Sequence, residues 1–77
     1  MNEKEENNEI RKHEELARYF WHAQIKVHIM TNSGVFYNGL IKFVGSDFFI
    51  IDDDKNKSVA VFFIELRKKI EEFTEET

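Results

Sequence analysis

The apolar periodicity of this chain changes once, near Ile25, and this change limits what the chain can fold into. From Glu9 to about Gln24, apolar residues recur at helical spacing along one face. That face consists of Ile10, Leu16, Ala17, Phe20 and Ala23. Beyond it, apolar and polar residues alternate, as in a half-buried strand. The sequence therefore predicts one amphipathic helix, with Asn7 or Asn8 as its N-cap, followed by β structure.

Five short strands are expected after the helix, separated by polar turns. They cover the alternating residues 25–29, the runs 35–44, 48–51 and 59–64, and a short stretch around Ile70 within 66–73. The fourth run, VAVFFI, lacks alternation, so we expect both of its faces to be covered, one of them by a neighbouring subunit.

The dipeptide Asn38-Gly39 interrupts the second run and has two readings. Asn-Gly is a strong hairpin signal, but a turn here would leave only Val35, Phe36 and Tyr37 for the strand before it. We favour a glycine inside one long, sharply bent strand. The expected fold is mainly β: an N-terminal α-helix on a strongly bent, five-stranded antiparallel open barrel of the small SH3 type.

The chain has 77 residues and no cysteine, which excludes disulfides, thiol catalysis and thiolate metal sites. A domain this small has a marginal core. Since it has neither disulfides nor a metal site to stabilise it, we expect it to oligomerise. There is no apolar stretch long enough for a membrane helix and no signal-peptide pattern, so we expect a cytoplasmic protein without a membrane partner.

The charge is uneven along the chain. Residues 1–9 carry −3 and residues 71–77 carry −4, which leaves +3 on residues 10–70 when the whole chain carries −4. We expect acidic flexible tails at residues 1–9 and 74–77 around a domain at 10–73. Net acidity does not exclude a nucleic-acid partner, because the field at the surface of the mildly basic body is what such a partner meets.

The stretch from Val27 to Ile41 resembles the first motif of the Sm-like (LSm) family, and its bacterial Hfq branch in particular. That branch reads roughly V-x-I-x-L-x-N-G-x-x-L-x-G-x-I, and the match runs without a gap through Val27, Ile29, Gly34, Gly39 and Ile41. The resemblance implies an N-terminal helix on a bent five-stranded barrel. It also implies a hexameric or heptameric ring formed by pairing the fourth and fifth strands across subunits, with single-stranded RNA as the partner.

Several functional positions depart from the family. The usual Asp and Asn of the loop after the bent strand correspond to Gly45 and Phe49, although Asp47 and Phe48 can serve after a small shift. The second motif, Arg-Gly or Tyr-Lys-His in the family, corresponds to Phe62-Phe63-Ile64. The polar groups that read uridine in the family's pore are therefore missing.

Base stacking and phosphate contacts remain available to this chain. Through the resemblance, Phe48 or Phe49 lies where the family stacks a base, and Asn38 stands where the Hfq branch has Gln. Lysines such as Lys42 offer phosphate contacts. The candidate RNA-binding residues are Asp47, Phe48, Phe49, Phe63, Met30, Asn32, Asn38 and Lys42. Because phenylalanine is usually buried, each phenylalanine among them is more readily interpreted as a residue of the core or of a subunit interface than as a base platform.

Nothing in the sequence indicates catalysis, a cofactor or a metal. His13, His22 and His28 lack metal-ligand spacing, and the triple aspartate lacks the Gly and distal Glu of a calcium loop. No nucleophile motif or phosphate loop is present. We therefore expect a non-enzymatic, ring-forming RNA scaffold or chaperone. The alternative is a homo-oligomer of the same fold that has lost RNA binding and acts as a protein-interaction module.

Overall fold

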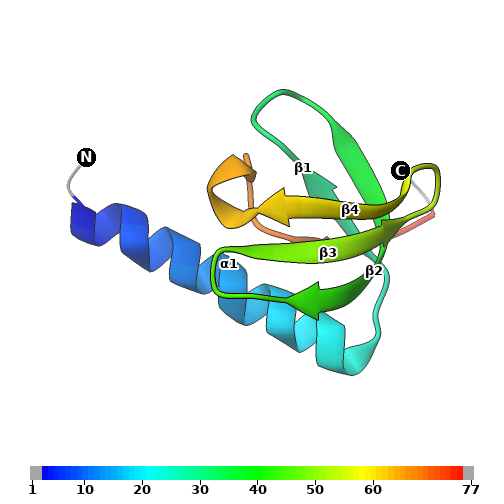
Figure 1. The fold of residues 1–77 in the computed structure, drawn as a ribbon, viewed down its shortest axis with the longest axis horizontal. Coiled ribbons are helices and arrows are strands. Elements are labelled where there is room, and N and C mark those ends of the chain that lie inside the picture. Colours follow the sequence, from blue (N-terminus) through cyan, green and yellow to red (C-terminus); the bar gives the residue numbers. More distant parts are fainter. Residues whose placement is uncertain (1–2, 76–77) are drawn as a thin grey trace.

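The computed structural model describes residues 3–75, with side chains from Asn8 onward. In this part of the chain one α-helix precedes five strands (Figure 1). The elements are α1 (Glu3–Ala23), β1 (Val27–Met30), β2 (Phe36–Val44), β3 (Phe48–Asp53), β4 (Lys57–Phe62), the 3-10 helix η1 (Phe63–Glu65) and β5 (Glu71–Glu72).

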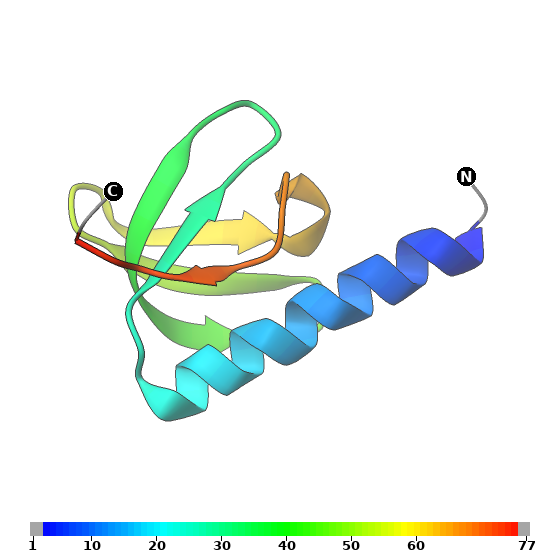
Figure 2. The ribbon, with the colours of Figure 1, turned by 180° about the vertical axis from the view of Figure 1, so that it is seen from behind.

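The strands form a single antiparallel sheet in the order β4-β3-β2-β1-β5. Within residues 3–75 the sheet is not closed, because β4 and β5 lie at its two edges and do not pair with each other. Helix α1 runs along the sheet, and its amino-terminal end projects beyond it (Figure 2). The predicted fold class, a helix followed by an open, five-stranded antiparallel sheet, is confirmed.

Helix α1 begins earlier than predicted, at Glu3 instead of near Glu9. Asn7 and Asn8 therefore lie inside the helix, and the prediction of an N-cap at either residue is wrong. The physical reason lies in the sequence EKEE, because Glu and Lys are good helix formers and negative charge is favourable near the amino end of a helix. The tails predicted at 1–9 and 74–77 lie partly outside the described residues, and residues 3–9 belong to α1.

Gly39 lies inside one continuous strand, so the bent-strand reading is confirmed and the hairpin reading is wrong. Strand β2 runs from Phe36 to Val44 and pairs with β1 on one side and with β3 on the other. It curves across both neighbours (Figure 1). A register shift between Ile41 and Phe43 adds a β-bulge near its end. The bulge leaves Lys42 and Phe43 both exposed, and Val44 returns to the core.

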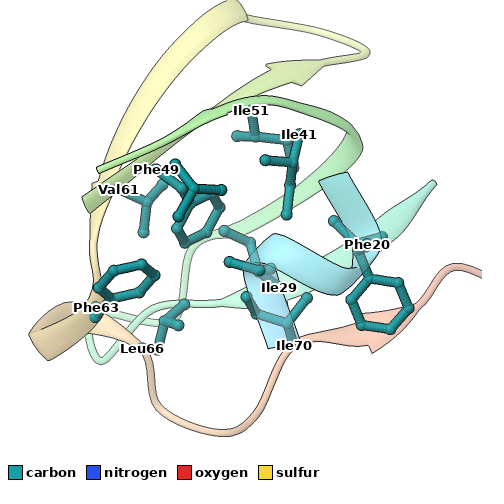
Figure 3. Packing of buried hydrophobic residues seen from close by; sticks show 12 residues of the cluster. Phe20, Ile29, Ile41, Phe49, Ile51, Val61, Phe63, Leu66 and Ile70 are labelled. Atoms are coloured by element: carbon teal, nitrogen blue, oxygen red, sulfur yellow. The ribbon is translucent and has the colours of Figure 1, made fainter. Parts of the chain in front are cut away.

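The core lies between the concave side of the sheet and α1 (Figure 3). From α1 it takes Ala17 and Phe20, which are 0% and 8% exposed. The strands and the η1 region contribute Val27, Ile29, Ile41, Val44, Phe49, Ile51, Val61, Phe63, Leu66 and Ile70. Burial of large apolar side chains is the main favourable contribution to folding in a domain of this size.

The VAVFFI run ends its strand sooner than predicted. Strand β4 stops at Phe62, where the backbone N–H donates to the Glu65 carboxylate at 2.9 Å, and η1 follows. Side chains alternate along the run: Val61 and Phe63 are buried, whereas Phe62 and Ile64 are 49% and 63% exposed. The described chain therefore covers only one face of the run. Coverage of the other face by a second subunit stays a prediction.

Candidate nucleic-acid interface

Four aromatic rings follow one another from the carboxyl-terminal end of α1 to the outer face of strands β2, β3 and β4. We call Trp21, Phe43, Phe48 and Phe62 the aromatic row. The centroids of Trp21 and Phe43 are 5.9 Å apart, those of Phe43 and Phe48 are 5.9 Å apart, and those of Phe48 and Phe62 are 5.8 Å apart. These spacings lie within the range of attractive aromatic pairs.

Strand register explains why the three rings on strands, Phe43, Phe48 and Phe62, share one face. Phe48 and Phe62 are directly opposite each other on β3 and β4, whereas their neighbours Phe49 and Val61 form the next pair and point into the core. The bulge at Lys42 brings Phe43 to the same outer face. Phe43 and Phe62 remain 45% and 49% exposed, which is a large apolar surface for a small domain.

The turn after β2 and the segment after β4 are held side by side. The backbone N–H of Phe63 donates to the carbonyl oxygen of Asp47 at 2.9 Å. A cavity of about 200 Å³ lies at this junction, with Asp47, Phe62 and Ile64 among its lining residues. The exposed Asp47 carboxylate thus lies beside half-exposed aromatic rings. This arrangement offers stacking surfaces and a hydrogen-bond acceptor for an unpaired base.

The predicted site residues divide into three groups. Asp47, Phe48 and Lys42 lie on the outer surface at or near the aromatic row. Phe49 and Phe63 are 0% and 1% exposed and stack on each other in the core at 5.7 Å, so neither offers a face for a base in this structure. Their burial has a physical reason, because each lies in phase with the inward residues of its strand or turn.

Met30, Asn32 and Asn38 lie away from the aromatic row. Arg67 joins the first two, with Nη1 donating to the Met30 sulfur at 3.7 Å and Nη2 donating to the Asn32 carbonyl at 3.2 Å. The Asn32 side chain donates to the Ile64 carbonyl. Asn38 lies on the β1–β2 ladder, where its Oδ1 is 2.6 Å from His28 Nδ1. The structure therefore does not bring all the predicted residues into one site.

Sequence reasoning did not select Phe43 or Phe62 as site residues. The signal that could have found Phe62 is the cross-strand register, since Phe48 on the outer face requires an outward partner on β4. The outward position of Phe43 results from a β-bulge that the sequence pattern does not predict.

No helix of the described residues is long and apolar enough to cross a membrane. In the same part of the chain, no three His, Asp or Glu side chains are grouped so that they could hold a metal ion. No family model, curated protein or solved structure matches this chain.

Proposed function

We propose that this protein is an Sm-like, ring-forming homo-oligomer that binds single-stranded RNA through the aromatic row, without catalysis. The observation on which the proposal depends is the junction of Asp47 and Phe48 with Phe62, where rings from two strands lie beside a polar turn. Aromatic side chains contribute about 1–3 kcal/mol for each stacked base and tolerate any sequence.

The sheet order supports the ring part of the proposal. Strands β4 and β5 are the two edges, and each pairs with a single neighbour within residues 3–75. Unpaired edges are a template for strand addition by another chain. Pairing of β4 in one subunit with β5 in the next would satisfy both edges and cover the exposed Phe62 and Ile64 in part.

The first experiment is native mass spectrometry of the protein purified without nuclease. A closed ring with heterogeneous added mass that RNase removes supports the whole proposal. A ring without such mass supports oligomerisation alone, and a monomer that binds no RNA would reject both parts.

The role of the aromatic row is tested by RNA affinity of Phe48→Ala and Phe62→Ala. Each variant loses one stacking surface, so we expect about 5- to 150-fold weaker binding. Tyr19→Ala is the matched control, because Tyr19 is 59% exposed on α1 and its ring contacts Phe20 rather than the row. If Phe48→Ala and Phe62→Ala bind RNA with the same affinity as Tyr19→Ala, the aromatic row does not take part in binding.

A second candidate function is a protein-interaction module built on the same oligomer. The free edge of β4, flanked by the exposed Phe62 and Ile64, favours it, because large exposed apolar surface commonly marks protein interfaces. This candidate predicts a ring that carries no RNA and gains none when single-stranded RNA is added.

A further inference from the structure

Three cavities that share lining residues follow one another along α1, between the helix and residues 62–69, and we call this surface the groove. It consists of three adjoining cavities of about 200, 290 and 320 Å³. The first two share Ile10, Phe63 and Ile64 in their walls, and the second and third share Glu9, His13, Leu66 and Arg67. The helical rise places Leu16, in the last cavity, about 9 Å along the axis from Ile10. The groove is therefore on the scale of a nucleotide.

The two ends of the groove differ in chemistry. The first cavity, at the aromatic row, is lined by Phe62 and Asp47. The last cavity brings together four cationic side chains against the single carboxylate of Glu9. These cations are Lys12 from α1 and Arg67, Lys68 and Lys69 from the segment before β5. One groove thus joins an aromatic surface to a positively charged one.

Two of these cations make neither an ion pair nor a side-chain hydrogen bond within the described residues. The Arg67 guanidinium is held by Met30 and Asn32, and the Lys68 ammonium pairs with Glu71 at 3.0 Å. Lys12 and Lys69 make no ion pair within the described residues. Lys12 lines this cavity from α1 and Lys69 lines it from the segment before β5, an arrangement that favours an anion in the cavity.

His13 adds an independent observation at the same place. It lines both the middle and the cationic cavity. Its Nδ1 is buried and has no hydrogen-bond partner among the described residues. A buried ring nitrogen without a partner is unfavourable and uncommon.

We propose that the cationic end of this groove, between Lys12 and Lys69, binds a phosphate group of the RNA strand whose base stacks on Phe48 and Phe62. This inference rests on the proposed RNA binding and adds the polarity of the site: base at the β4 end, phosphate at the middle of α1. It also gives a role to Arg67-Lys68-Lys69, whose position beside Lys12 is visible only in the fold.

The first test is the salt dependence of binding to a short labelled oligouridylate. The double variant Lys12→Gln/Lys69→Gln should bind more weakly, and the slope of log K against log salt should become shallower by about 1.4 if each lysine neutralises one phosphate of a single strand. The control Lys55→Gln/Lys57→Gln removes two exposed lysines, one in the β3–β4 turn and one at the first residue of β4, and should keep the wild-type slope. Equal losses in both double variants would overturn the groove assignment.

The second test separates the groove from RNA binding as a whole. Uridine 5′-monophosphate, but not uridine, should shift the ring resonances of His13 and the backbone amide of Lys69 in NMR spectra of the full-length protein. If oligouridylate does not bind while the monophosphate still shifts His13, the proposed function fails and the phosphate site stands. If oligouridylate binds without these effects, the proposed function stands and the groove inference fails. A shift with an oligoglutamate peptide alone would also overturn it, in favour of an acidic protein partner.

Discussion

Gly39 on β2 lies directly against the backbone of Asp52 on β3. A Cβ atom at Gly39 would overlap the Asp52 carbonyl oxygen and would lie 2.8 Å from the Asp52 carbonyl carbon. Because the obstacle is backbone within a paired strand, it cannot move without breaking the β2–β3 ladder. The close approach of these strands, and the bend in β2, therefore depend on the missing side chain.

Gly39→Ala should destabilise the fold by about 1–3 kcal/mol, as expected for forced overpacking. Chemical denaturation measures the change. Gly45→Ala is the matched control, because its Cβ would meet the half-buried Phe48 ring, at 2.9 Å, and a side chain can shift. We expect a smaller loss for Gly45→Ala. A Gly39→Ala variant as stable as the wild type would contradict the role of this contact.

Asp53 organises the β3–β4 turn with its carboxylate. Its Oδ1 accepts from the backbone N–H of Asn38 at 2.8 Å, and its Oδ2 accepts from the N–H groups of Lys55 and Asn56 at 3.1 and 2.9 Å and from the Asn56 side chain at 3.0 Å. Burial alone would raise the pKa of Asp53, but these hydrogen bonds outweigh it and lower the pKa below its ordinary value.

The lowered pKa of Asp53 predicts acid-sensitive stability. The carboxylate stabilises the fold above the unfolded-state pKa of about 4, and this contribution is lost as the pH falls through the lower folded-state value. Asp53→Asn should lose about 1–3 kcal/mol at neutral pH, since an amide cannot accept all four bonds. The free energy of unfolding should also depend less on pH below about 4. Asp52→Asn, at the exposed neighbouring position, should retain the wild-type profile.

His13 predicts a second pH dependence, at higher pH. Burial lowers the pKa of its imidazole below 6.5, and the carboxylate of Glu9 opposes this only in part. Lys12, Arg67, Lys68 and Lys69 line the same cavity and add positive charge. The unfolded state therefore takes up a proton more readily than the folded state, and stability falls as the pH drops below about 6.5.

Denaturation at pH 7 and near pH 5 checks the prediction for His13. His13→Gln should flatten the fall in stability across this window, whereas His22→Gln, at an exposed position, should leave it intact. An unchanged profile in His13→Gln would assign the effect to other groups.

The local pattern of apolar and polar residues was enough to predict the elements whose formation depends on residues close together in the sequence. The amphipathic face around Ala17 and Phe20 predicted the helix, and the apolar residues on both sides of Gly39 predicted a bent strand. The start of α1 was missed because a Glu-rich segment is compatible with both a helix and a solvated tail. Sequence alone does not decide whether such a segment extends the adjacent helix or forms a tail.

The candidate site depended on contacts between distant residues, which periodicity does not determine. In each of the pairs Phe48-Phe49 and Phe62-Phe63, the register of β3 against β4 decides which ring faces outward. A shift of one residue would exchange the two faces. The groove could not be predicted either. Lys12 and Lys69 line the same cavity only because α1 packs beside the segment after η1.

The two phenylalanine pairs give a direct test of this register. Phe49→Ala removes a fully buried ring and should cost about 3–5 kcal/mol, a large part of the stability of a small domain. Phe48→Ala, on the outer face, should cost far less. Thermal unfolding of both variants provides the comparison, with Phe49→Leu as the milder core variant if Phe49→Ala does not fold. Similar losses at positions 48 and 49 would contradict the outward position of Phe48.

The acidic carboxyl-terminal residues are expected to compete with RNA for cationic groups, but the fold limits what can be removed. Glu71 and Glu72 form β5 on the edge of β1, and the Phe73 N–H donates to the Lys26 carbonyl at 2.9 Å. Deletion of residues 71–77 should therefore destabilise the sheet. Deletion of residues 75–77 removes two negative charges and spares β5.

We expect the 75–77 deletion to bind oligouridylate more tightly than the full chain at low salt. The difference should shrink near 0.1 M salt or above, where the screening length falls to about 10 Å. Titrations of both proteins over a range of salt concentrations measure this effect. A charge-matched control, Glu75→Gln/Glu76→Gln in the full-length chain, should reproduce the tighter binding, because the effect comes from charge and not from chain length. Equal affinities for the deletion and the full chain at every salt concentration would show that these residues do not compete with RNA.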